Sequence, residues 1–107
     1  MSYQVIMTET AKGDLRDIAR YILEESGDRE TARHFVTALR EKCRELRDFP
    51  NRGALPKDYL LRNAGYRYLV YRHYLIFYVT DEASRKVLIH AFFHEKMDYF
   101  KKLQSLV

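Results

Sequence analysis

The chain has 107 residues, of which 47% are hydrophobic, and a formal net charge of +4. A chain of this length can bury one core without a metal or a disulfide, so we expect a single domain over residues 1–107. The lone Cys43 excludes an internal disulfide, and no stretch approaches the roughly 18 apolar residues of a membrane span. The N-terminus lacks a signal-peptide pattern, which predicts a cytoplasmic protein with no membrane partner.

Charge is concentrated in the middle third of the chain. Residues 28–73 carry eleven basic and six acidic side chains, which gives +5, whereas residues 1–27 give −2 and residues 74–107 give +1. A basic surface suits nucleic acid or an acidic protein partner. Many of these arginines fall on a predicted helix with glutamates between them, however, and an ion-paired, solvated helix face is the interpretation we prefer.

The first elements are a strand and a helix. Apolar side chains alternate through Met1–Met7, which indicates a strand. Thr8 or Thr10 then offers a hydroxyl to the first turn of a helix, and Gly27 can adopt the left-handed conformation that ends one. Between them, apolar residues recur at intervals of three and four and form one stripe, at Ala11, Leu15, Ile18, Ala19 and Ile22.

A second helix follows almost without a connector. Asp28 is its predicted N-cap and Pro50 its end, and the apolar positions between them keep the helical spacing, at Ala32, Phe35, Val36, Leu39, Cys43 and Leu46. Two helices joined so tightly form an antiparallel hairpin. Asn51–Asn63 has no sustained period and is predicted to be a loop.

The last third predicts a meander of three strands, at Tyr66–Tyr71, Tyr74–Val79 and Val87–Phe93, because these runs are rich in aromatic and β-branched residues. A short helix is expected from Glu95 to about Gln104. Alternation places Arg67, Leu69 and Tyr71 on one face of the first of these strands. The same rule places Leu88, His90, Phe92 and His94 on one face of the last, so that an arginine and two histidines could share a surface. His90 lies among apolar neighbours and is interpreted as a packing residue.

The order strand, helix, helix, three strands, helix is an α+β arrangement, with a helical hairpin on a small, largely antiparallel four-stranded sheet. Together with several short motifs, this order resembles the RelE/ParE family of bacterial type II toxins. The motifs are DLRDIARYI in the first helix, ARHFVTALREKCRELRDFPNRG, GYR at the second strand, IFY in the third, and VLIHAFFHEKMDYFKKL at the end. The resemblance spans nearly the whole chain.

The resemblance implies a toxin that a cognate antitoxin wraps and holds inactive. Within the family, members similar to RelE cut mRNA on the ribosome, and members similar to ParE block DNA gyrase. Neither activity implies a cofactor or a metal. The apolar stripes of the hairpin are expected to face the sheet, and they also supply the antitoxin-binding candidates Leu15, Ile18, Ile22, Phe35 and Leu39.

An RNA-cleaving site needs a proton acceptor, a proton donor and fixed cations around one phosphate. Arg67, in GYR, aligns with the family's phosphate-contacting arginine, and His94 aligns with a histidine of some nucleases; Tyr99 completes the candidate catalytic set. Nuclease relatives also place two lysines or a glutamate in the loop before the second strand, where Lys57 stands alone. The candidates for contact with a target of either kind are Arg62, Arg67, Arg72, His94 and Asp98.

This incomplete set favours the gyrase-blocking branch. The alternative is a metal-independent, ribosome-dependent mRNA endonuclease, for which the partners would be the ribosome and mRNA. A non-toxic nucleic-acid-binding domain comes third, because the middle third is basic.

Overall fold

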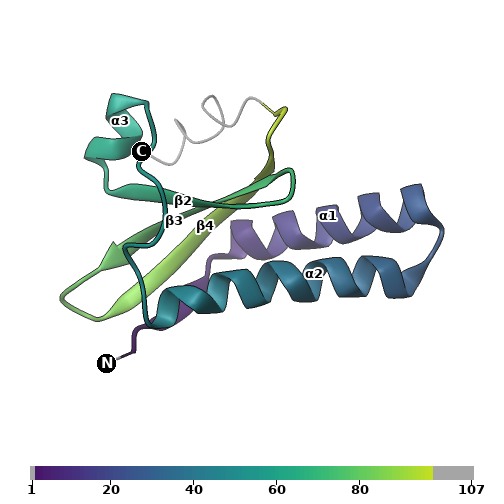
Figure 1. Cartoon of the computed structure of the whole chain (residues 1–107), viewed down its shortest axis with the longest axis horizontal. Helices are drawn as coiled ribbons and strands as arrows, with labels where there is room; N and C mark the ends of the chain where they lie inside the picture. The colour runs from purple at the N-terminus through teal and green to yellow at the C-terminus, as the bar shows by residue number, and fades with distance from the viewer. Residues whose placement is uncertain (1, 98–107) are drawn as a thin grey trace.

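The computed structural model describes residues 2–97. Its elements follow the predicted order (Figure 1): β1 (Gln4–Met7), α1 (Glu9–Ser26), α2 (Arg29–Arg44), the 3₁₀ turn η1 (Glu45–Arg47), α3 (Tyr59–Asn63), β2 (Tyr66–Tyr71), β3 (Tyr74–Asp81) and β4 (Lys86–His94). The loop prediction for Asn51–Asn63 missed α3. The expected C-terminal helix lies mostly outside the described residues. No described helix has the length and apolarity needed to cross a membrane.

Capping residues determine where the two helices of the hairpin begin and where the first one ends. Thr8 Oγ1 accepts the amide of Ala11 at 3.1 Å, so Thr8 and not Thr10 begins α1. Gly27, with φ of 68°, ends α1 by donating its N–H to the carbonyl of Leu23. Asp28 caps α2 by accepting the amide of Glu30, as predicted from the sequence. α2 ends at Arg44 and tightens into η1, so that the chain leaves the helix before Pro50.

The four strands form one mixed sheet in the order β1-β4-β3-β2. β2, β3 and β4 are antiparallel neighbours, and β1 pairs in parallel with the first half of β4, from Gln4 opposite Lys86 to Met7 opposite Ile89. The parallel pair is possible because the hairpin carries the chain across before it returns to the sheet. The predicted α+β fold is therefore confirmed.

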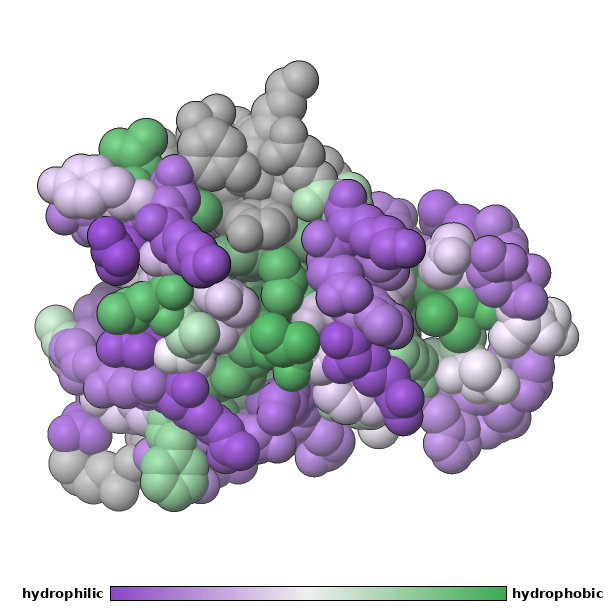
Figure 2. Space-filling model, turned by 45° about the horizontal axis from the view of Figure 1, so that its top comes forward, coloured by the Kyte–Doolittle hydropathy of each residue, from purple (hydrophilic) through white to green (hydrophobic). Residues whose placement is uncertain are grey.

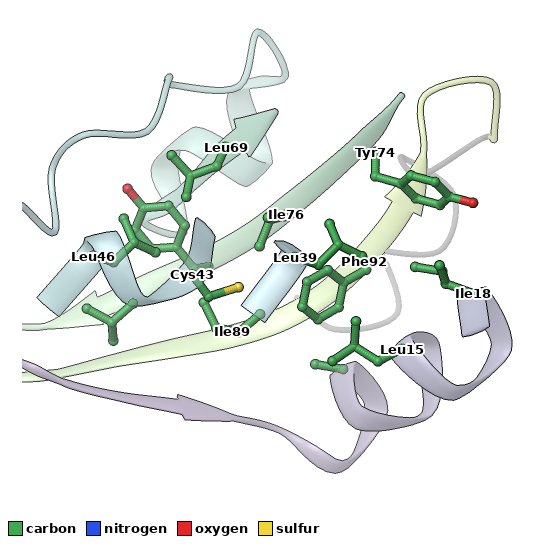
Figure 3. Packing of buried hydrophobic residues seen from close by; sticks show 13 residues of the cluster. Leu15, Ile18, Leu39, Cys43, Leu46, Leu69, Tyr74, Ile76, Ile89 and Phe92 are labelled. Carbon is green, nitrogen blue, oxygen red and sulfur yellow. The ribbon is translucent and has the colours of Figure 1, made fainter. Parts of the chain in front are cut away.

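The main core lies between the hairpin and one face of the sheet (Figure 3). Leu15 and Ile18 come from α1 and Leu39 and Cys43 from α2, and they meet the sheet side chains Leu69, Tyr74, Ile76, Ile89 and Phe92. A second, smaller cluster lies on the opposite face, where Leu61 of α3 packs with Tyr66, Phe77, Ala91 and Phe93. The sheet is thus apolar on both sides.

A β-bulge in β4 decides which face each of its residues occupies. Phe77 pairs with Ala91 and Tyr78 with Ile89, which leaves His90 unpaired between them. Since one extra residue shifts the alternation, His90 packs edge-on against Tyr66 at 5.5 Å, while His94 contacts Tyr74 on the other face. The expectation that the two histidines share a face is wrong. Burial lowers the pKa of His90, which fits its interpretation as a packing residue.

Candidate functional site

Arg67 lies on β2 and binds a loop of its own chain. Its Nη1 donates to the carbonyl oxygen of Gly53 at 2.9 Å and to that of Asn51 at 3.3 Å. The neighbouring Tyr78 holds the same loop: its hydroxyl donates to the carbonyl of Pro50 at 2.7 Å and accepts the N–H of Gly53 at 2.9 Å. Arg67, to which the family resemblance assigns a phosphate contact, therefore uses its Nη1 to fix residues 51–53 to the sheet.

His94 lies at the end of β4 in a cluster of aromatic rings. It stacks on His73 with ring centroids 6.1 Å apart and meets Tyr74 edge-on at 5.2 Å. Its Nδ1 accepts the N–H of Lys96 at 3.1 Å, so a proton on the ring sits at Nε2. Nδ1 of His73 in turn lies 2.7 Å from Oε1 of Glu95. This geometry leaves Nε2 as the ring nitrogen of His94 that can donate to a ligand.

Arg67 and His94 belong to different parts of the sheet. Arg67 pairs with Tyr78 at one end of β3, whereas His94 pairs with Tyr74, which in turn pairs with Tyr71 at the other end. Four residues along a strand span about 13 Å, and two strand spacings add about 10 Å sideways. One phosphate cannot contact both side chains in this arrangement.

The region around His94 includes a cavity of about 400 Å³ between α1 and the end of β4, lined by Asp14, Asp17, Ile18, Tyr21, Tyr74, Phe92, His94, Lys96 and Met97. β1 ends opposite Ile89, and beyond it the start of α1 contacts the edge of β4, where Thr8 Oγ1 donates to the carbonyl of His90 at 3.3 Å. Asp14 Oδ2 accepts the amide of Phe92 at this edge, at 3.0 Å. Sequence reasoning missed Asp14, because a lone acidic residue on a polar helix face gives no signal.

The remaining target-binding candidates are scattered. Arg62 lies in the last turn of α3, far along the chain from Arg72, which occupies the β2–β3 turn with φ of 53° and lies 5.7 Å from the Tyr71 ring. Asp98 and Tyr99 lie outside the described residues, so the structure does not place them. Of the candidate catalytic residues, the structure places only Arg67 and His94, and it separates them.

The antitoxin-binding candidates differ in their burial. Leu15, Ile18 and Leu39 are 3%, 7% and 0% exposed, because the apolar stripes of the hairpin pack on the sheet. Ile22 and Phe35 are half-buried at the edge of that core, where Phe35 meets Tyr71 and Tyr74 edge-on. Ile22 and Phe35 therefore offer a partner more accessible surface than the other three, which lie mainly in the core.

The basic face of α2 is largely ion-paired. Arg33 contacts Glu30 and Arg44 contacts Glu41, each one turn apart, while Lys42 and Arg52 both approach Glu45. Local carboxylates therefore offset much of the charge, as the solvated-face interpretation predicts. Cys43 is buried among apolar side chains, which raises its pKa to about 12 and leaves an unreactive thiol. Within residues 2–97, no cluster of three metal-ligating side chains occurs.

Comparison with solved structures identifies the class of fold. Over 87% of this chain and 96% of the other, the structure resembles a toxin–antitoxin chain of the chromosomal ParDE system of P. aeruginosa, with a TM-score of 0.72 and 19% identity. A chain of the RelBE2 complex of Mycobacterium tuberculosis matches with a TM-score of 0.66 and 23% identity, over 88% of this chain and 92% of that one. A mutant of E. coli toxin RelE in the free state matches over the full length of both chains, with a TM-score of 0.65 and 13% identity.

The sequence comparison is more specific than the fold. The family described as the ParE toxin of the parDE type II toxin–antitoxin system matches residues 5–99, nearly the whole chain. The chain therefore belongs to the ParE toxin family, within the wider RelE/ParE superfamily. No curated protein matches it significantly.

Proposed function

We propose that this protein arrests bacterial growth by blocking DNA gyrase in the cytoplasm, and that a cognate antitoxin holds it inactive until release. Membership of the ParE toxin family supports a toxic activity for this chain and a cognate antitoxin as its partner. The single observation that favours gyrase over the ribosome is the position of Arg67. Its guanidinium is bound to two loop carbonyls and lies far from His94, so these two candidates do not supply a cation and a proton donor to the same phosphate.

The ribosome-dependent mRNA endonuclease remains the second candidate. It would draw on Arg67, His94 and Tyr99, and His94 keeps an Nε2 proton that could serve a leaving oxygen. Against it, Lys57 is exposed and has no second lysine beside it in its loop. A non-toxic nucleic-acid-binding domain has less support still, because two of the four arginines of α2, Arg33 and Arg44, are paired with glutamates.

A single preparation of the purified protein can separate the two targets. We expect inhibition of gyrase supercoiling without any ribosome, and intact mRNA in a toeprinting assay on programmed ribosomes. In cells, expression should arrest growth and co-expression of the adjacent antitoxin should restore it. Cleavage of mRNA in the ribosomal A site, with normal supercoiling, would overturn the proposal in favour of the endonuclease.

The variant Arg67→Ala provides a second, independent test, which asks whether Arg67 stabilises the fold or acts on RNA. We expect it to lower the free energy of unfolding by about 1–3 kcal/mol, because two hydrogen bonds from a charged donor to the loop are lost. Folded Arg67→Ala protein should still inhibit gyrase, with a loss no larger than loosening of the loop at residues 51–53 causes. Arg40→Ala, which removes an exposed arginine of α2, serves as the control and should leave stability nearly unchanged. If Arg67 acts on RNA, the substitution should instead reduce cleavage about a hundredfold at equal folded concentration.

A further inference from the structure

In the segment 53–60, before β2, the residues that are buried are small, whereas large apolar side chains are exposed. Gly53 and Pro56 are buried, whereas Leu55, Tyr59 and Leu60 are 52%, 65% and 54% exposed. Figure 2 shows hydrophobic side chains reaching the surface at the end of the molecule that carries α3. We call Leu55, Tyr59 and Leu60 the α3 patch. Three large apolar side chains displayed together on one short segment are typical of an interaction surface.

The geometry of α3 prevents Tyr59 and Leu60 from turning inward. Asp58 caps the helix by accepting the amide of Leu61 at 3.0 Å. Leu61 is 1% exposed and fills the cluster on the far face of the sheet, with Tyr66 and Phe77. Because neighbouring residues of a helix point in different directions, burial of Leu61 directs Tyr59 and Leu60 outward. The exposure therefore follows from how α3 is anchored.

The segment that leads to the patch is held to the sheet at residues 50–54. Ala54 and Tyr68 exchange backbone hydrogen bonds of 2.8 and 2.9 Å, and Tyr78 and Arg67 fix the residues just before them. A partner would thus meet a surface that is already ordered, and binding would cost little conformational entropy. In this arrangement Arg67 has a structural role, because it fixes residues 51–53, which lead into the patch.

The charges around the patch select the partner. Lys57 and Arg62 lie beside it and are exposed. Asp58, whose Oδ1 caps α3, adds one negative charge, so these three residues together carry a net charge of +1. Arg52 is bound to Glu45 and takes no part. Two cations beside an aromatic ring and two leucines match a protein surface with an apolar pocket and acidic borders. Nucleic acid would use the cations and the ring and would leave both leucines without a role.

We propose that the α3 patch is the surface by which this toxin docks on its protein target, and that the target offers an apolar pocket bordered by carboxylates. This inference rests on the proposed function, with gyrase as the target. Tyr59 and Leu60 are the anchors that enter the pocket, and Lys57 and Arg62 steer the approach. Aromatic side chains of this kind contribute a large share of binding energy when a partner desolvates them.

The test is a double substitution, Tyr59→Ser with Leu60→Ser, compared with Leu23→Ser and Phe49→Ser, which remove exposed apolar side chains elsewhere. Binding to purified gyrase and inhibition of supercoiling are measured at equal folded concentration, checked by thermal melting. We expect at least a tenfold loss for the patch variant and none for the control. Binding of the cognate antitoxin should be unchanged in both. Lys57→Glu with Arg62→Glu should slow association with gyrase.

Equal inhibition by the patch variant and the control would overturn the inference while the proposed function stands. A loss of antitoxin binding with gyrase inhibition intact would also overturn it, as would a loss confined to binding of a single-stranded oligonucleotide. If the wild-type protein has no effect on gyrase, the proposed function fails first. The patch is then judged by growth arrest, which the double substitution must abolish and the control must retain.

Discussion

Replacing Leu39 with alanine is expected to lower the free energy of unfolding by about 2–5 kcal/mol. The side chain is 0% exposed and joins α2 to the sheet, so its removal leaves a cavity in the main core (Figure 3). Native stabilities of small domains are about 5–15 kcal/mol, and a loss of this size would take a large part of the total. Chemical denaturation, followed by circular dichroism, measures the change.

Leu23→Ala is the matched control, because Leu23 lies on α1 with 37% of its surface exposed. It should cost under about 1 kcal/mol. The comparison also tests whether Leu39 binds an antitoxin. If Leu39 bound an antitoxin from outside, Leu39→Ala would weaken the complex and leave the isolated toxin as stable as before, which would contradict its place in the core.

Gly53→Ala is expected to destabilise the protein by about 1–3 kcal/mol through overpacking. A Cβ at this position would lie 2.6 Å from the Tyr78 hydroxyl and 2.9 Å from the backbone oxygen of Tyr68. Tyr78 is fully buried and the Tyr68 oxygen accepts the amide of Ala54, so neither can move away freely. The loop must shift instead, and its hydrogen bonds to Tyr78 and Arg67 weaken. Thermal or denaturant unfolding of the purified variant measures the loss.

Two further variants make this result specific. Gly13→Ala, in α1, would meet only the guanidinium of Arg16 at 3.7 Å and should stabilise the helix by up to about 1 kcal/mol. In a Tyr78→Phe background, Gly53→Ala should cost less than it does alone, since one of its clashes is gone. A destabilisation by Gly53→Ala equal in both backgrounds would show that the hydroxyl is not the obstacle.

If the α3 patch docks on the target, Gly53→Ala should also reduce gyrase inhibition, because the loop that shifts carries Leu55. The effect on inhibition should be smaller than that of the double substitution at Tyr59 and Leu60, which removes the anchors themselves. The same folded samples serve for both measurements. The two measurements together test whether the loop around Gly53 affects both the free energy of unfolding and the inhibition of gyrase.

The elements of this fold could be predicted from the sequence because their causes are local. The spacing of apolar residues determines α1 and α2, and the caps Thr8, Gly27 and Asp28 need only neighbours within one turn. The three aromatic-rich runs of the last third likewise become β2, β3 and β4. The family could also be recognised, since its motifs are short and occur in order along the chain.

The site could not be predicted in the same way, because its causes are contacts between distant segments. One extra residue at His90 moves it to the face opposite His94, and nothing in the alternation of apolar residues marks the bulge. Arg67 reads as an outward strand residue until the loop at residues 51–53 is seen lying across it. Leu15 and Leu39 could equally face a sheet or a partner by pattern alone. Only packing between elements assigned them to the core, because an amphipathic stripe specifies that it must be buried and not which surface buries it.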